Sequence, residues 1–299
     1  MINPSSKYSL FLGLTLFTSA CVPKSPDPLS LMPEDSKFIM SFSAAPLISL
    51  DVLSNAPSEF QEILGQLKEC DIELNNDSRI TMGASELQKN EEAFTLLFEH
   101  KGISDSKTIT CLLEKSKIGE KTQLSTIDKK RALVGLSEKD KDGCFLIGKN
   151  TLACSTGNTM DGLSKRLDKK GTSVLDSNLA EHASHISPDS SAWLLISSDV
   201  LTKELKGTPV EKTTSILVHL DLEEDTKNMN VSFEMGMADA ETSEKTYNDL
   251  KMLMDNIGAM GLPDFISNSL KHEQRDSYIF MSVVVPASEG KELLKEIAR

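Results

Sequence analysis

The sequence is poor in features that mark several protein classes. Aromatic residues make up 5% of the 299 residues and tryptophan occurs once, which leaves no aromatic platform for sugars. Basic residues are outnumbered, with 32 Lys and Arg against 45 Asp and Glu and a formal net charge of -13. Because such a chain repels phosphate backbones and anionic surfaces, we expect no nucleic-acid partner.

Motifs for catalysis and cofactors are also missing. The sequence contains no Gly-x-Ser-x-Gly, no Cys-x-x-Cys and no Gly-rich phosphate loop, the patterns of several hydrolases, redox proteins and nucleotide-binding proteins. The cysteines stand too far apart for the close Cys pairs of structural zinc sites. We therefore expect no cofactor and a role other than catalysis. A hydrolase whose site is assembled from distant residues stays an alternative.

The sequence has one strongly apolar run, and it is short. Residues 8–17 follow Lys7 and precede the small residues Thr18–Ala20, an arrangement typical of a secretory signal peptide. The run has roughly half of the 20 residues that a membrane-spanning helix needs. We therefore predict a signal peptide over residues 1–20.

Ser19-Ala20-Cys21 resembles the end of the lipobox of bacterial lipoproteins, in which small residues precede a cysteine that receives a diacylglyceryl group. Thr18 stands where the lipobox usually has leucine. The resemblance implies that Cys21 is lipidated, becomes the mature N-terminus and anchors the protein to a membrane. In a Gram-negative cell, Val22 implies the outer membrane. Ordinary cleavage after Ala20 is the alternative and implies a periplasmic or secreted protein.

Proline is concentrated behind this cysteine. Residues 22–35 contain four prolines, a composition that favours an extended chain over a packed core. We therefore predict a tether over residues 21–35, long enough to hold the folded part about 40 Å from a membrane.

The other four cysteines are an even number, which suits two disulfides in an oxidising compartment. A hairpin loop at residues 148–150 would place Cys144 directly opposite Cys154. Cys70 and Cys111 then remain to pair with each other. We predict the disulfides Cys144–Cys154 and Cys70–Cys111, with free buried thiols as the alternative.

Short apolar strands and helical segments share the rest of the chain. The predicted strands include residues 124–127, 132–136, 144–147 and 151–154, and alternating apolar residues predict a hairpin over 216–237. Helices are predicted at 160–167, at 178–185, from Ser104 as N-cap to Lys115, and after the cap Asp239. Because the order lacks the strict alternation of a parallel α/β protein, we predict an α+β fold with antiparallel sheets and helices packed on one face.

A short phrase recurs along the chain. Pro33 and Pro188 each begin a proline–acid–serine turn that leads into an apolar strand, and in this match Phe38 corresponds to Trp193. We therefore predict two related modules. The modules span residues 36–186 and 187–299.

His182 and His185 lie three residues apart on the predicted helix 178–185, which places both imidazoles on one helical face. Such a pair can share a divalent metal, but the zinc-protease pattern uses a spacing of four with a glutamate between. We predict an exposed helix face and no metal site, and keep this pair only as a candidate.

The proline–acid–strand opening and Cys111 resemble secreted bacterial lipoproteins of two α+β modules, a group that brings no known activity. The sequence therefore predicts a lipid-anchored envelope protein with a non-enzymatic binding or structural role, whose partners are the membrane and an envelope protein. A carrier or chaperone for apolar cargo is the alternative.

The lipid on Cys21 is directly testable. We expect mass spectrometry of the mature N-terminus to find a diacylglyceryl group on Cys21, and a Cys21→Ala chain to lose membrane association. An unmodified cysteine would return the protein to the periplasmic or secreted alternative.

Overall fold

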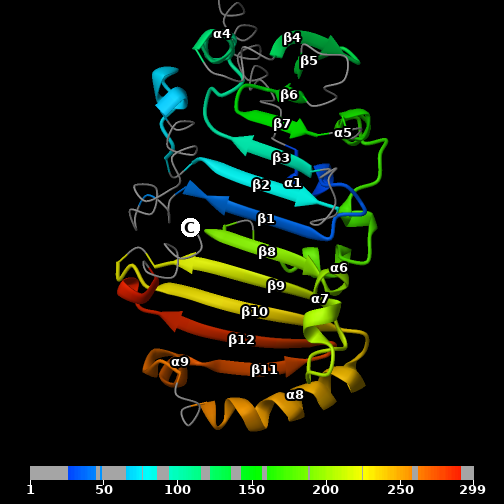
Figure 1. Ribbon diagram of the computed structural model, residues 1–299, viewed down its shortest axis with the longest axis vertical. Coiled ribbons are helices and arrows are strands. Elements are labelled where there is room, and N and C mark those ends of the chain that lie inside the picture. The colour runs from blue at the N-terminus through cyan, green and yellow to red at the C-terminus, as the bar shows by residue number, and fades with distance from the viewer. Residues whose placement is uncertain are drawn as a thin grey trace, which may run out of the picture.

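One antiparallel sheet organises the part of the chain that the structure describes (Figure 1). The computed structural model describes residues 26–44, 48, 65–75, 77–85, 94–115, 122–135, 143–156, 160–187, 189–223, 225–257 and 262–290. Within these ranges, twelve strands pair in the order β11-β12-β10-β9-β8-β1-β2-β3-β7-β6-β5-β4, and every pair is antiparallel. The prediction of an antiparallel α+β fold is therefore confirmed.

The sheet has two halves that meet at its centre, where β1 pairs with β8. The half that comes first in the sequence contains β1 (Phe38–Ser43), β2 (Arg79–Ala84), β3 (Phe94–Glu99), β4 (Thr122–Ile127), β5 (Lys130–Gly135), β6 (Gly143–Ile147) and β7 (Thr151–Ser155). The other half contains β8 (Ala192–Ser197), β9 (Thr213–Leu222), β10 (Met229–Met237), β11 (Lys271–Arg275) and β12 (Tyr278–Val285). Strands of both halves therefore contribute to each face.

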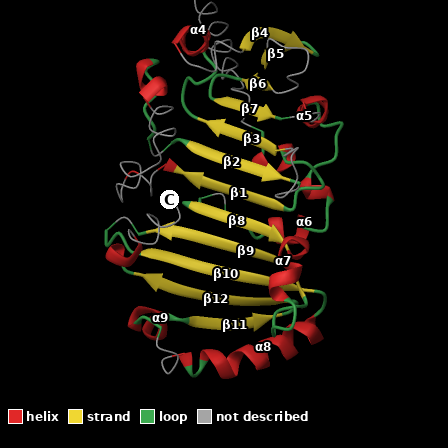
Figure 2. Cartoon of the chain, in the orientation of Figure 1, coloured by secondary structure: helices red, strands yellow, loops and turns green. Residues whose placement is uncertain are grey.

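Helices pack against both faces, whereas the sequence predicts them on one. The first face, which carries the core residues Ile39, Leu97, Leu195 and Leu217, is covered by α1 (Pro28–Leu31), α5 (Met160–Leu167), η4 (Val174–Asp176) and α6 (Ala180–Ala183). The second face receives α4 (Ser106–Lys115), α8 (Ala240–Met254) and α9 (Asp264–Ser269). Helix α7 (Ser198–Leu205) follows β8, and Figure 2 shows α8 running along the sheet edge beside β11. None of the described helices is both long and apolar enough to cross a membrane.

The residues just before β1 belong to the core of the first face. Leu31 and Met32 are 1% and 0% exposed, and burying side chains of this size contributes roughly 1.5–3 kcal/mol each. Gly83 leaves the space that Met32 fills, because a Cβ there would lie 2.6 Å from the Met32 sulfur. Arg166 donates from Nε to the Leu31 carbonyl at 2.7 Å. The prediction of a tether over the whole of 21–35 is therefore wrong, since its second part packs.

Both disulfides that the sequence predicts are present, Cys70–Cys111 and Cys144–Cys154. Cys144 and Cys154 are register partners in the hairpin of β6 and β7. All four cysteines lie in or against the cluster that Ile109 of α4 forms with the outer strands. The Cys70–Cys111 bridge thus ties α4 to residues 65–72, and the Cys144–Cys154 bridge joins two adjacent strands.

Other local predictions meet mixed outcomes. The β4–β7 meander is present, α5 has the predicted bounds, and the Asp239 carboxylate caps α8 by accepting from Thr242 N at 2.7 Å. Ser104, by contrast, does not cap α4. Its hydroxyl donates to the Thr151 carbonyl at 2.6 Å, and α4 begins two residues later.

The division into two related modules is not confirmed. The pairing of β1 with β8 makes one continuous sheet across the predicted boundary. Ser41 and Trp193 are register partners, so they share a face, and Phe38, three positions before Ser41, lies on the opposite face. The matched residues Phe38 and Trp193 therefore do not occupy equivalent places.

Phe145 is 0% exposed in the main core, whereas Phe233 is 36% exposed. We expect Phe145→Ala to lower the free energy of unfolding by about 3–5 kcal/mol, because it leaves a cavity. The matched control Phe233→Ala should cost less than about 1 kcal/mol. Urea unfolding with the disulfides oxidised measures both changes, and equal losses would contradict this description of the core.

Candidate functional site

A cavity of about 840 Å³ lies on the first face, beneath α1 and α6. Its walls are mostly apolar and include Leu29, Leu175, Ile186 and Trp193. Ligand pockets of proteins commonly have such a volume and such a lining, with a few polar groups that orient the ligand. Here the polar groups come from neighbouring strands of the sheet.

Ser41, Arg79 and Glu99 supply polar groups to the pocket from the central strands. Arg79 donates from Nη1 to Ser41 Oγ at 3.2 Å and from Nη2 to the Ser190 carbonyl at 2.8 Å. Burial lowers the pKa of Arg79, an effect that the charges of Glu99 and Asp189 oppose. Burial likewise raises the pKa of Glu99, against the charge of Arg79. The pocket thus combines apolar walls with a cation and a carboxyl group.

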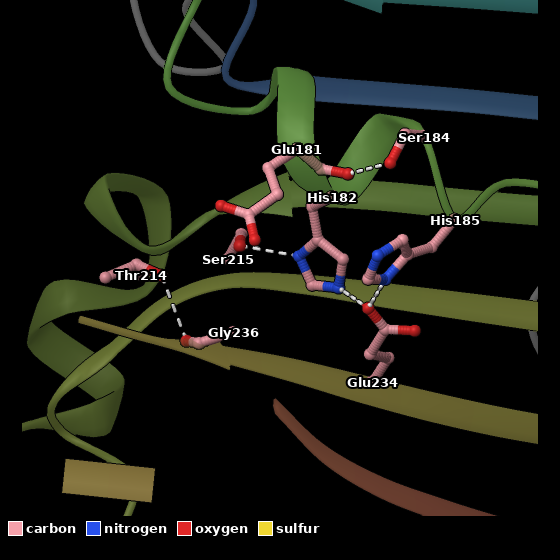
Figure 3. A network of polar contacts seen from close by, with 8 residues as sticks. All are labelled: Glu181, His182, Ser184, His185, Thr214, Ser215, Glu234 and Gly236. Atoms are coloured by element: carbon pink, nitrogen blue, oxygen red, sulfur yellow. Dashed lines mark hydrogen bonds and ion pairs between the residues drawn. The ribbon is translucent and has the colours of Figure 1, made fainter. Parts of the chain in front are cut away.

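A second polar cluster lies beside the pocket, where α6 crosses the sheet (Figure 3). His182 and His185 come from α6 and the residues just after it, and their side chains are 2% and 34% exposed. Ser177 orients the start of α6 by donating to the Val174 carbonyl and accepting from Leu179 N. The spacing of three residues then turns both imidazoles toward the sheet.

Glu234 meets these imidazoles from β10. Because side chains alternate along a strand, Glu234 faces α6 while Phe233 and Met235 face the other side. Its carboxylate Oε1 lies 2.7 Å from His182 Nε2 and also contacts His185 Nδ1. Burial acts to raise the pKa of Glu234, but the contacts with the two histidines outweigh it and hold this pKa below its ordinary value. The buried carboxylate is therefore compensated by its neighbours.

Other side chains fix the orientation of His182. Its second ring nitrogen, Nδ1, lies 2.6 Å from the Ser215 hydroxyl on β9. The Tyr278 ring packs against both imidazoles, with ring centres 5.2 Å from His182 and 4.8 Å from His185. Burial, followed by the nearby carboxylate of Glu181, raises the pKa of Tyr278, so its phenol stays neutral.

The remaining histidines each have a simpler partner. His100 bonds with Ser78, His219 with Ser190, and His272 with Tyr247. Among the described residues, only His182, His185 and Glu234 form a group of metal-ligating side chains whose ligand atoms lie within 4.8 Å of one another.

The prediction of an exposed helix face is wrong for His182, which the sheet buries, whereas His185 is exposed as predicted. Glu234 was not among the predicted site residues. The alternation of β10 shows only that it faces away from Phe233 and Met235, and nothing local indicates that α6 covers that face. Cys21, the predicted lipid site, lies outside the described residues.

No family model and no curated protein sequence matches the chain. Solved structures do: crystal form III of TP0453 is 9% identical, with a TM-score of 0.54, over 91% of this chain and 99% of that chain. Form IV is 10% identical, with a TM-score of 0.56, over 91% and 97%. The chain shares the fold of TP0453. At this identity, the likeness to TP0453 concerns the fold alone.

The lowered pKa of Glu234 has a consequence for stability. Because the folded state favours the ionised form of Glu234, this carboxylate stabilises the folded state at pH values above its ordinary pKa of 4.5. The stabilisation is lost as the pH falls through the lower pKa of the folded state. We expect the stability difference between the parent and Glu234→Gln to be largest above about pH 5 and to shrink below about pH 4. Urea unfolding in the presence of a chelator measures it, with the exposed Glu244→Gln as control. A difference that grows toward low pH would contradict the lowered pKa.

Proposed function

We propose that the protein is a lipid-anchored, extracytoplasmic binding protein that holds a small amphipathic ligand in the pocket beneath α1 and α6. The observation that carries this proposal is the pocket itself, about 840 Å³ with apolar walls and the ionisable side chains of Arg79 and Glu99. The apolar walls suit an acyl or ring system, and the polar groups suit a head group that both donates and accepts hydrogen bonds.

The position of the pocket along the chain supports a membrane-side role. Pro26 and Asp27 line the pocket, and Cys21 precedes Pro26 by five peptide units, which span at most about 18 Å. A lipid on Cys21 therefore keeps the pocket close to the membrane, where apolar ligands are concentrated. In a Gram-negative cell this membrane is the outer one, and an envelope protein is the partner that would deliver or receive the ligand.

The chemistry of the pocket favours binding over catalysis. The Ser41 hydroxyl lines the pocket, accepts from Arg79 and bonds with Thr81 Oγ1 at 2.9 Å. Activation of a serine requires a general base on its hydroxyl, and a guanidinium cannot act as one. The same residues can, however, orient a ligand head group.

Trp193 makes the pocket directly observable, because it lines the pocket and is the single tryptophan of the sequence. We expect lauric acid, dodecylamine or dodecanol, added to the unlipidated Cys21→Ser chain without detergent, to change the Trp193 emission saturably. Tighter binding of lauric acid would indicate that the head group contacts Arg79, and tighter binding of dodecylamine would indicate Glu99.

Ser184→Phe should weaken this binding at least about tenfold, or by 1.4 kcal/mol, because Ser184 lines the pocket and the ring takes up space that the ligand needs. Ser187→Phe, an exposed position outside the lining, is the matched control and should bind normally. A linear, non-saturable change in emission, or equal binding by both variants, would remove the support for a ligand pocket.

A further inference from the structure

We propose that His182, His185 and Glu234 form a binding site for a divalent transition-metal ion, with Zn²⁺ as the preferred occupant. This site goes beyond the proposed ligand pocket, since it uses different side chains and a different chemistry.

The donor set is the first argument. His182 Nε2, His185 Nδ1 and a Glu234 carboxylate oxygen all lie within 4.8 Å of one another, although α6 and β10 are about 50 residues apart in sequence. Two imidazoles and one carboxylate hold zinc in several proteins. Imidazole suits zinc, copper, nickel and iron, whereas magnesium and calcium prefer oxygen ligands alone. The class of ion follows from these donors.

A buried nitrogen of His182 also favours a bound ion. His182 is 2% exposed, and its Nε2 makes no hydrogen bond of acceptable geometry, although Glu234 Oε1 lies only 2.7 Å away. A buried polar atom without a hydrogen bond is costly. A cation that is bound by the lone pair of Nε2 and by the negatively charged Oε1 removes that cost.

The partner of the opposite ring nitrogen supports the same assignment. Ser215 Oγ lies 2.6 Å from His182 Nδ1, and in the ion-bound state Nδ1 can donate its proton to this oxygen, which leaves the lone pair of Nε2 for the ion. Metal-ligating histidines commonly donate their other N–H to a fixed acceptor in this way. Gly236 permits the arrangement, because a Cβ there would lie 2.8 Å from Ser215 Oγ.

The cluster can adopt the geometry of a bound ion with small movements. Zinc-to-nitrogen distances near 2.0–2.1 Å place tetrahedral ligand atoms about 3.3 Å apart, so each histidine nitrogen must move slightly away from Glu234 Oε1. His185 has the freedom to move, since its side chain is 34% exposed. The same exposure admits a water molecule as a fourth ligand.

The test is a titration of the full chain, freed of metal by a chelator and dialysed, with Zn²⁺ alone. We expect one zinc ion per chain, a higher Tm on zinc addition and no comparable effect of Mg²⁺ or Ca²⁺. Co²⁺ should give the visible spectrum of a four- or five-coordinate nitrogen–oxygen site. Glu234→Gln and His185→Gln should each weaken zinc binding by about 100-fold or more, since loss of even an indirect supporting group costs 10–100-fold.

His272→Gln is the matched control. His272 also contacts a tyrosine, Tyr247, and a carboxylate, Asp255, but no second histidine, so its replacement should leave zinc affinity unchanged. Because the His185 side chain is partly exposed, we expect His185→Gln to fold. This variant therefore tests the site even if Glu234→Gln unfolds. The proposed site is overturned if the parent does not bind zinc or if His185→Gln binds zinc as tightly as the parent. An equal loss of zinc affinity in His272→Gln and His185→Gln would overturn it too. The Trp193 titration is unaffected by that failure, so the ligand pocket and the metal site fail independently.

Discussion

The pairing of β1 with β8 is the constraint on which the rest of the structure depends. It joins strands that are about 150 residues apart in sequence, and it converts two sets of strands into one sheet with a continuous buried face. Ser41 and Trp193, which both line the pocket, are register partners across this junction. Arg79 and Glu99 then continue the same face outward, each paired with its neighbour on the next strand. The pocket therefore exists only where the two halves meet.

Long-range pairing also explains what the sequence could and could not predict. Local patterns were sufficient for the β4–β7 meander, for α5, for the β9–β10 hairpin and for both disulfides, because each depends on residues close in sequence or on elimination among four cysteines. The edge strand β11, Lys271–Arg275, contains no apolar residue and gives no strand signal of its own; it forms because β12 offers it a partner. The join at β1 and β8 has no local signal either.

The candidate site was likewise predictable only where it depends on residues close in sequence. The sequence shows the spacing of His182 and His185 and the alternation of apolar residues in β10. The burial of Glu234, however, depends on α6 crossing the sheet. Proline content predicted a tether and missed that Leu31 and Met32 are buried and that Met32 fills the space above Gly83. In each case a few well-packed side chains override the composition of their segment. Sequence thus predicted the donors of the cluster in part, and the tertiary structure brings them together.

Helix α6 links the pocket and the cluster physically. It has only four residues, too few to be stable alone, so its position must come from its contacts with the sheet. Ala183 and Ser184 line the pocket, while His182 and His185 reach Ser215 and Glu234. Any ion held by the histidines would fix α6 more firmly and so define one wall of the pocket. By linkage, a ligand that prefers this position of α6 raises the affinity for the ion by the same factor. The short helix is therefore the element through which the two proposed sites would communicate.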